Sequence, residues 1–292
     1  RESYYLATKL PCWLVDSREK AEELFHTQLE RLDRDYVDFY LLHSLSRRTW
    51  TKMVELKIPS LLEEYQRQGK IRKLGFSFHD DYEVFEEILR FRHWDFCQIQ
   101  LNYMDTEHQA GLKGLELARG LGVPVVVMEP VKGGTLVKLP DSVADILRAA
   151  EPGAPLASWA LRFAGSLPNV IAVLSGMNTP EMVAENAAIM RDGVPLTPAE
   201  HEVIEAARDA LAALPGVPCT DCRYCVKGCP EGVHINTIMQ SLNIYDQMGD
   251  AYRAQENYNW NTGDGKASAC IQCGACEPRC PYNLPIRQMM QK

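Results

Sequence analysis

Short apolar runs alternate along the chain with longer segments whose apolar residues recur at helical spacing. The runs are rich in β-branched and aromatic residues, which predicts strands. We place these strands at residues 4–9, 37–42, 72–78, 96–101, 124–128 and 170–174. After the first run, Ala21, Leu24, Phe25 and Leu29 recur every three or four residues, as in an amphipathic helix. The strands show little alternation of apolar and polar residues, so the sheet should be buried on both faces.

The order of these elements predicts an α/β fold. Six strand-then-helix units in succession indicate a parallel sheet with helices packed on it. Units in this number and register suggest a (β/α)8 TIM barrel that is short by two units. One connection, residues 44–57, is expected to be a loop of more than ordinary length.

Helix and linker signals mark the end of the predicted barrel. Thr197, Pro198 and Glu200 form a capping box with proline at the first helical position, which predicts a long helix to Leu214. A proline- and glycine-rich linker follows, and eight of the ten cysteines lie beyond it. Between the two groups of cysteines, residues 257–265 are polar and are expected to form a loop. We therefore divide the chain into a barrel domain at 1–196, a helix and linker at 197–218, and a small helix-containing domain at 219–292.

Charge and hydropathy argue against several classes of protein. The net charge is −8 at pH 7, and no block of lysine and arginine stands out. Nucleic acid and anionic membranes are therefore poor partners. The chain has no apolar run of the roughly 18 residues that a membrane helix needs, and it opens with no signal segment. We expect a soluble, cytoplasmic protein that binds neither nucleic acid nor membranes.

The strongest chemical signal is a cysteine pattern that occurs twice with the spacing C-x2-C-x2-C-x3-C-P. The first run is Cys219, Cys222, Cys225 and Cys229, and the second is Cys270, Cys273, Cys276 and Cys280. Three thiolates in one short loop can hold three corners of an iron–sulfur cube, while the fourth, next to a proline, reaches elsewhere. This is the spacing of the bacterial ferredoxin run, whose fourth cysteine ligates the other cluster.

The spacing therefore predicts two 4Fe-4S clusters with crossed ligands. One cluster is assigned to Cys219, Cys222, Cys225 and Cys280, and the other to Cys270, Cys273, Cys276 and Cys229. An uncrossed assignment is the alternative. Zinc is another, because C-x2-C pairs also build tetrahedral sites, but three ligands of one short loop on a single zinc would be unusual. A disulfide framework is a third, although nothing else in the chain indicates secretion.

Several short motifs at the ends of the predicted strands resemble those of the aldo/keto reductase family. They are Ala7-Thr8-Lys9, Leu41-Leu42-His43, Gly75-Phe76-Ser77-Phe78-His79, Gln98-Ile99-Gln100, Met128-Glu129-Pro130, and Thr179-Pro180-Glu181 through Glu185-Asn186. Each is weak alone, but their order makes the resemblance specific. With the cysteine runs, the chain is similar to the group of this family that carries a C-terminal 4Fe-4S dicluster domain of ferredoxin type.

The resemblance implies hydride transfer between a nicotinamide cofactor and a carbonyl or alcohol substrate. It identifies Lys9 as the catalytic lysine and His43 as the catalytic histidine. The family's tyrosine and aspartate belong to its first two β/α units, which precede the first residue here. From these residues alone we expect neither a closed barrel nor catalysis. If the two residues have no catalytic role, Lys9 is an ion-pairing residue at a strand end, and His43 is a buried histidine with its hydrogen bonds satisfied.

The resemblance also implies contacts to NAD(P). Ser77 and Gln98 match the side chains that hold the nicotinamide carboxamide, and Met128 stands where many relatives place an aromatic ring. The remaining matches are Val131, Gly133 and Gly134 at the diphosphate, and Gly176, Asn178, Glu185 and Asn186 at the adenosine. Relatives that prefer NADP have basic side chains where this chain has Gly176 and Met182, so the choice between NAD and NADP stays open.

These features together predict an iron–sulfur oxidoreductase in which hydride transfer is coupled to electron transfer through two clusters. A nicotinamide gives two electrons at once, whereas a cluster passes one, and a flavin is the usual intermediary. A flavoprotein or ferredoxin is therefore a candidate redox partner. The alternatives are a nucleotide-binding electron carrier that serves a partner protein, and a barrel whose clusters are purely structural.

Overall fold

The computed structural model describes residues 4–191, 195–219 and 221–292. The chain forms two compact units. The first unit consists of residues 1–133 and 157–199, and the second of residues 134–156 and 200–292. The second unit therefore includes segments upstream of the cysteine runs, and the sequence-based boundaries at 196 and 218 stay predictions.

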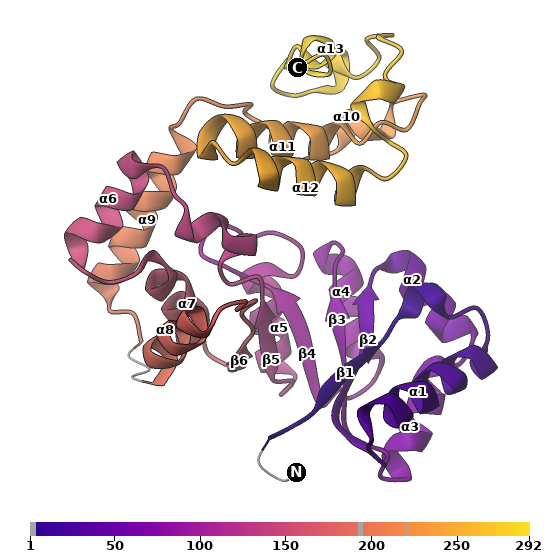
Figure 1. The fold of residues 1–292 in the computed structure, drawn as a ribbon. Helices are drawn as coiled ribbons and strands as arrows, with labels where there is room; N and C mark the ends of the chain where they lie inside the picture. Colours follow the sequence, from indigo (N-terminus) through magenta and orange to yellow (C-terminus); the bar gives the residue numbers. More distant parts are fainter. Residues whose placement is uncertain (1–3, 192–194, 220) are drawn as a thin grey trace. The chain divides into compact units, whose positions relative to one another are not determined.

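A parallel sheet of six strands forms the centre of the first unit (Figure 1). The strands are β1 (Ala7–Leu10), β2 (Val37–Leu45), β3 (Ile71–Phe78), β4 (Phe96–Gln100), β5 (Val125–Met128) and β6 (Val170–Val173). They lie in the order of the sequence, and every neighbouring pair is parallel. The predicted α/β fold of six β/α units is confirmed.

Helices follow the strands, as the apolar spacing predicts. In the first unit they are α1 (Arg18–Leu32), α2 (Arg47–Glu55), α3 (Ile58–Arg67), α4 (Tyr82–Phe91), α5 (Gly111–Gly120), α7 (Leu156–Ser166) and α8 (Pro180–Arg191), with the 3-10 turn η1 (Cys12–Leu14). A second 3-10 turn, η2 (Lys132–Val137), begins in this unit and ends in the second. The largest apolar cluster joins Tyr40 of β2 and Phe76 of β3 to Phe25 of α1 and Phe85 of α4. The Phe25 and Tyr40 rings pack edge to face with centroids 5.1 Å apart, and the Phe76 and Phe85 rings are tilted with centroids 5.9 Å apart.

A second, smaller apolar cluster lies on the opposite face of the sheet. Leu41, Phe96 and Val126 are buried there, with Phe39 packed against them. Successive side chains of a strand point to opposite faces. His43 therefore shares this face with Leu41, as Gln98 does with Phe96. By the same alternation, polar side chains near the C-terminal ends of these strands lie on this face of the sheet.

The prediction of a loop at residues 44–57 is wrong, because most of this segment is helix α2. Ser46 caps the helix through its side chain, and its own backbone N–H donates to Thr49 Oγ1 at 2.8 Å. Trp50 and Met53 lie one turn apart and are buried. In the sequence these two apolar residues are surrounded by arginines and threonines, so apolar spacing alone does not indicate the helix.

The second unit is mainly helical. Its elements are α6 (Asp141–Ala150), α9 (Pro198–Ala212), α10 (Tyr224–Lys227), α11 (Ile235–Met248), α12 (Ala251–Thr262), η3 (Ala267–Ala269), η4 (Glu277–Arg279) and α13 (Ile286–Met289). Helices α11 and α12 lie side by side (Figure 1). We predicted residues 257–265 as a polar loop, but the helix continues to Thr262. Asn257 donates to Ser241 of α11 at 2.9 Å, so its polarity serves the helix pair.

Gly75 of β3 is expected to tolerate no side chain. A Cβ added there would lie 2.6 Å from the carbonyl oxygen of Phe96 and 2.7 Å from its ring. Gly75→Ala should therefore lower the free energy of unfolding by about 1–3 kcal/mol, as overpacking does elsewhere. Urea denaturation measures the change, and Gly120→Ala, with nothing within 4 Å, is the matched control. Equal stabilities of the two variants would contradict the close packing.

Candidate functional site

Lys9 and His43 lie at the C-terminal ends of the neighbouring strands β1 and β2. Lys9 pairs with Leu41, and His43 follows on the same face two residues later. Burial lowers the pKa of His43 from its ordinary 6.5, and the positive charge of Lys9 lowers it further. Burial also lowers the pKa of Lys9. The geometry therefore provides a neutral imidazole beside a half-buried ammonium group at pH 7.

Aromatic and hydroxyl groups hold the histidine segment in place. The Trp13 ring lies against the His43 ring, with centroids 4.9 Å apart. The next residue, Ser44, donates its backbone N–H to Ser77 Oγ at 2.8 Å. Ser77 is 1 % exposed and keeps its hydroxyl proton available for another acceptor.

Ser77 and Gln98 form a polar pair across β3 and β4. The two residues are directly opposite in the ladder, and Gln98 is 4 % exposed. Gln98 Nε2 contacts the Met128 sulfur at 3.0 Å. The structure thus brings together three of the side chains that the sequence assigns to the nicotinamide end of the cofactor.

A buried polar network that the sequence analysis missed supports the loop after β5. Asn102 is fully buried, and its Nδ2 donates to Asp105 at 3.1 Å and to the backbone oxygen of Glu129 at 3.2 Å. Burial opposes ionisation of Asp105, but Lys132 Nζ at 2.5 Å holds the pKa of that carboxyl below its ordinary value. The network fixes a turn in which Lys132 and Gly133 both have positive φ.

The other predicted cofactor positions are less enclosed. Val131 and Gly133 lie in this loop and are partly exposed, while Gly134 belongs to the second unit, where Arg253 approaches it. Asn186 of α8 donates to Ser175 Oγ at 2.9 Å, which ties the helix to the loop after β6. Gly176, Asn178 and Glu185 are exposed. Their role toward an adenosine group stays a prediction.

Removing the Lys9 charge should raise the pKa of His43. The expected result is that the imidazole of Lys9→Met titrates at a higher pH than that of the wild type, yet still below 6.5, because the burial remains. NMR of the histidine ring protons over pH 4–8 measures it. Lys20→Met, on the exposed start of α1, is the control. An unchanged titration in Lys9→Met would show that the two groups are not close.

The eight cysteines of the two runs line two cavities in the second unit. The first cavity is lined by Cys229, Cys270, Cys273 and Cys276, and the second by Cys219, Cys222, Cys225 and Cys280. Each cavity measures about 350 Å³, open solvent included. The fourth cysteine of each run thus joins the three of the other run, which is the grouping that crossed ligation requires. Ligation itself stays a prediction.

The repeat extends beyond the cysteines, which the sequence analysis did not notice. Aligning the two runs also pairs Val233 with Leu284, Ile235 with Ile286, and Met239 with Met290, and these residues line the cavities. The backbone repeats as well. Positive φ occurs at three paired positions: Asp221 and Gln272 at 57°, Arg223 at 60° and Gly274 at 78°, Gly232 at 61° and Asn283 at 50°. Two equivalent half-sites therefore form one internal repeat.

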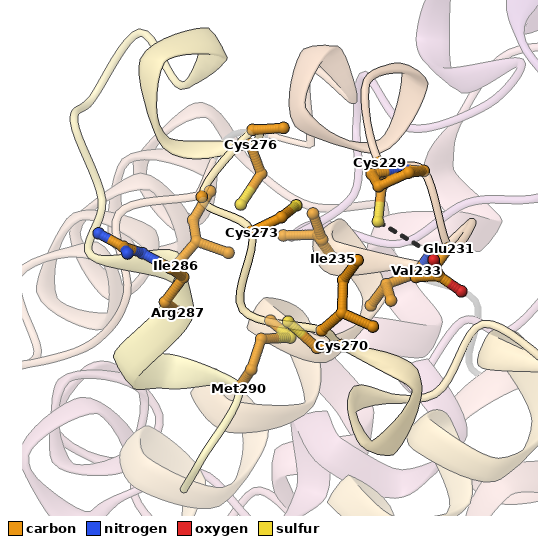
Figure 2. A pocket seen from close by; sticks show the side chains of 14 residues that line it. Cys229, Glu231, Val233, Ile235, Cys270, Cys273, Cys276, Ile286, Arg287 and Met290 are labelled. Carbon is orange, nitrogen blue, oxygen red and sulfur yellow. Dashed lines mark hydrogen bonds between the residues drawn. The ribbon is translucent and has the colours of Figure 1, made fainter.

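The donor set fits iron–sulfur clusters. The thiols surround each space instead of converging, and in the described part of the chain no three His, Cys, Asp or Glu side chains are grouped to hold one metal ion. Figure 2 shows the four cysteines of the first cavity around its rim, with Ile235, Ile286 and Met290 on its walls. The backbone N–H of Val233 donates to the Cys229 sulfur at 3.4 Å. Sulfur ligands, an apolar wall and N–H donors to sulfur are what a 4Fe-4S cluster needs.

The cysteines outside the runs differ from those around the cavities. All ten cysteines are free thiols, but Cys12 and Cys97 are completely buried in the first unit. Burial raises the pKa of Cys12 to about 12. Both residues therefore act as small apolar side chains.

Comparison with known proteins identifies the first part of the chain. The sequence profile described as "Aldo/keto reductase family" matches residues 1–209. The chain belongs to the aldo/keto reductase family. A second profile, "4Fe-4S dicluster domain", matches residues 218–284, so this aldo/keto reductase carries an iron–sulfur domain of ferredoxin type at its C-terminal side. The predicted family and domain are confirmed.

Individual relatives agree with this assignment. The chain is 25 % identical over 221 residues to the NADH-specific methylglyoxal reductase of Escherichia coli, a match that covers 67 % of this chain and 66 % of that relative. The aldo-keto reductase AKR11C1 of Bacillus halodurans, in its holo form, has a TM-score of 0.59 and 27 % identity over 71 % of this chain and 73 % of that one.

A third relative supports the fold alone. An aldo-keto reductase of Klebsiella pneumoniae in complex with NADPH has a TM-score of 0.57 at 22 % identity over 70 % of each chain. This aldo/keto reductase spans just under two thirds of the length of the methylglyoxal reductase. Within its described residues, no helix is both long and apolar enough to cross a membrane.

Proposed function

We propose that the protein is an iron–sulfur oxidoreductase that transfers hydride between a nicotinamide cofactor and a small carbonyl or alcohol substrate. Two 4Fe-4S clusters are linked to this reaction through a flavoprotein partner, which takes up or supplies the two electrons of the nicotinamide and exchanges them one at a time with the clusters. The observation that carries the proposal is the pair of cavities, each lined by four cysteines, in a chain of the aldo/keto reductase family. The NADH in the name of one relative supports a nicotinamide cofactor.

The side chains of the sheet face have distinct roles in this proposal. His43 is neutral at pH 7 because burial lowers its pKa, so its ring N–H can donate to the substrate oxygen. Lys9 places a positive charge beside the position where negative charge develops on that oxygen. The Trp13 ring contacts the His43 ring on one side.

The nicotinamide supplies the hydride and its two electrons when it is bound. The side chains of Gln98 and Ser77 lie on the same face of the sheet. Gln98 offers its amide group, and Ser77 its hydroxyl proton, for hydrogen bonds to the carboxamide. The Met128 sulfur lies against Gln98 and provides a polarisable surface for the ring. Asn102, Asp105 and Lys132 hold the loop that carries Val131 and Gly133.

Metal analysis of anaerobically purified protein is the first test. We expect about eight irons and eight sulfides per chain, as two 4Fe-4S clusters require, and visible absorbance that bleaches with dithionite. Zinc without sulfide would remove the redox part of the proposal and leave a barrel protein with a metal-bound structural domain.

Cofactor binding is tested separately by fluorescence titration with NADH and NADPH. Gln98→Leu should weaken binding about tenfold, since losing a hydrogen bond to the carboxamide costs on the order of 1.4 kcal/mol. Gln68→Leu, at the exposed end of α3, is the control. Clusters without any nicotinamide binding would favour the alternative function of an electron carrier for a partner protein.

A further inference from the structure

The two cavities are built on the same backbone but differ in the side chain at one equivalent position. Asp221 follows Cys219 by two residues, and Gln272 follows Cys270 by two. Both have a φ of 57°, so their side chains leave the loop from the same conformation. The second cavity thus has a carboxylate where the first has an amide.

These two side chains contact residues at matching places in the repeat, but with opposite hydrogen-bonding roles. Asp221 Oδ1 accepts from Asn236 Nδ2 at 2.7 Å, and Gln272 Nε2 donates to the backbone oxygen of Arg287 at 3.3 Å. Asn236 and Arg287 occupy matching places in the repeat. The amide of Gln272 also donates to the Cys270 sulfur at 3.5 Å. A carboxylate can donate no such bond, because it only accepts.

This difference should shift the reduction potentials of the two cluster sites in opposite directions. A hydrogen bond to a ligand sulfur stabilises the added negative charge of a reduced cluster and raises its potential, while a nearby anion lowers it. The Asp221 side chain is 24 % exposed, so water screens its charge incompletely. The cluster site of the second cavity is therefore the harder one to reduce.

The remaining charges do not reverse this order. Each cavity has one arginine–acid pair, Arg223 with Asp221 at 3.3 Å and Arg287 with Glu277 at 2.8 Å. Figure 2 shows the Arg287 guanidinium directed away from the four sulfurs. Glu231 lines the first cavity but is exposed, so water screens its charge.

We propose that Asp221 and Gln272 make the two cluster sites inequivalent, so that the second cavity holds the lower-potential cluster and the first the higher-potential one. One electron then passes from the second cavity to the first: the donor cluster is oxidised by one electron, the acceptor is reduced by one, and no proton or atom moves. The inference rests on the proposed presence of two clusters. It gives the direction of electron flow within the domain.

A potentiometric titration of the full chain, followed by EPR with dithionite as reductant, tests this order. The wild type should show two midpoints. Asp221→Asn, which keeps the size of the side chain, should raise the lower midpoint alone, and Gln272→Glu should lower the higher one alone. We expect about a tenfold change in the reduction equilibrium, which is about 59 mV for one electron. Glu202→Gln, at an exposed position of α9 that lines neither cavity, is the control and should move neither midpoint by more than a third of that amount.

Iron and sulfide analysis accompanies each titration and separates the outcomes. Variants that keep about eight irons but show unmoved midpoints would overturn the inference and leave the two-cluster function standing. A shift of the higher midpoint in Asp221→Asn, or identical midpoints in the wild type, would also overturn it. Protein that contains no cluster would overturn the proposed function itself, and the inference with it.

Discussion

Replacing Cys229 by alanine is expected to remove one cluster, and the lost cluster should be that of the other cysteine run. Cys229 belongs to the first run in sequence but lines the first cavity with Cys270, Cys273 and Cys276. Iron and sulfide should fall to about half of the wild-type content, because a cluster that loses one of four thiolates is held poorly. Cys280→Ala should cause the same loss at the second cavity.

Double variants show which cluster is lost. Cys229→Ala combined with Cys273→Ala removes two ligands of the same cavity, so the iron content should stay at about half. Cys229→Ala combined with Cys222→Ala removes one ligand from each cavity and should abolish cluster binding. Under uncrossed ligation the two double variants would exchange their results. Cys97→Ala, at a buried cysteine of the first unit, is the control and should keep all the iron.

Removing both clusters is expected to unfold the region around the cysteines while the sheet stays folded. Amide hydrogen exchange should accelerate on the order of tenfold or more in residues 217–239 and 267–290 of the iron-free protein. The reason is that the core there is small and contains Cys225 and Cys276 themselves among its buried members. Metal binding in such a domain supplies much of its folding free energy.

The sheet provides the internal control for the same experiment. Strands β2 to β5 are covered by a large apolar cluster that contains no cysteine of the two runs. Their exchange rates should therefore not change when iron is removed. Equal protection of the cysteine-rich region with and without iron would mean that the clusters add nothing to its stability, and their role would then be redox chemistry alone.

The sequence predicted the sheet well because its strands are short apolar runs bounded by clear breaks. The expected run at 72–78 is β3 (Ile71–Phe78), and the run at 96–101 is β4 (Phe96–Gln100). It failed at α2, where only Trp50 and Met53 mark the buried side, and at the end of α12, where asparagines form bonds within and between helices. Polar helices hidden in this way need tertiary contacts to be recognised.

The candidate site likewise contains residues that the sequence identified and residues that only the structure revealed. Motif spacing was enough to select Lys9, His43, Ser77 and Gln98, and alternation along the strands places all four on one face. The network of Asn102, Asp105 and Lys132 was missed, because nothing in the sequence separates a fully buried asparagine from one in an exposed loop.

The sequence by itself determined which residue types occur and at what spacing: six β/α units, the strand-end lysine and histidine, and two cysteine runs of ferredoxin type. The spacing predicted the crossed grouping of the cysteines but left the uncrossed one open, and the tertiary structure lines each cavity with the crossed set. Only the structure shows that Gln272 donates to the Cys270 sulfur whereas Asp221 accepts from Asn236. The physical reason is that spacing within one loop fixes local geometry, whereas contacts between distant loops depend on how the whole domain packs.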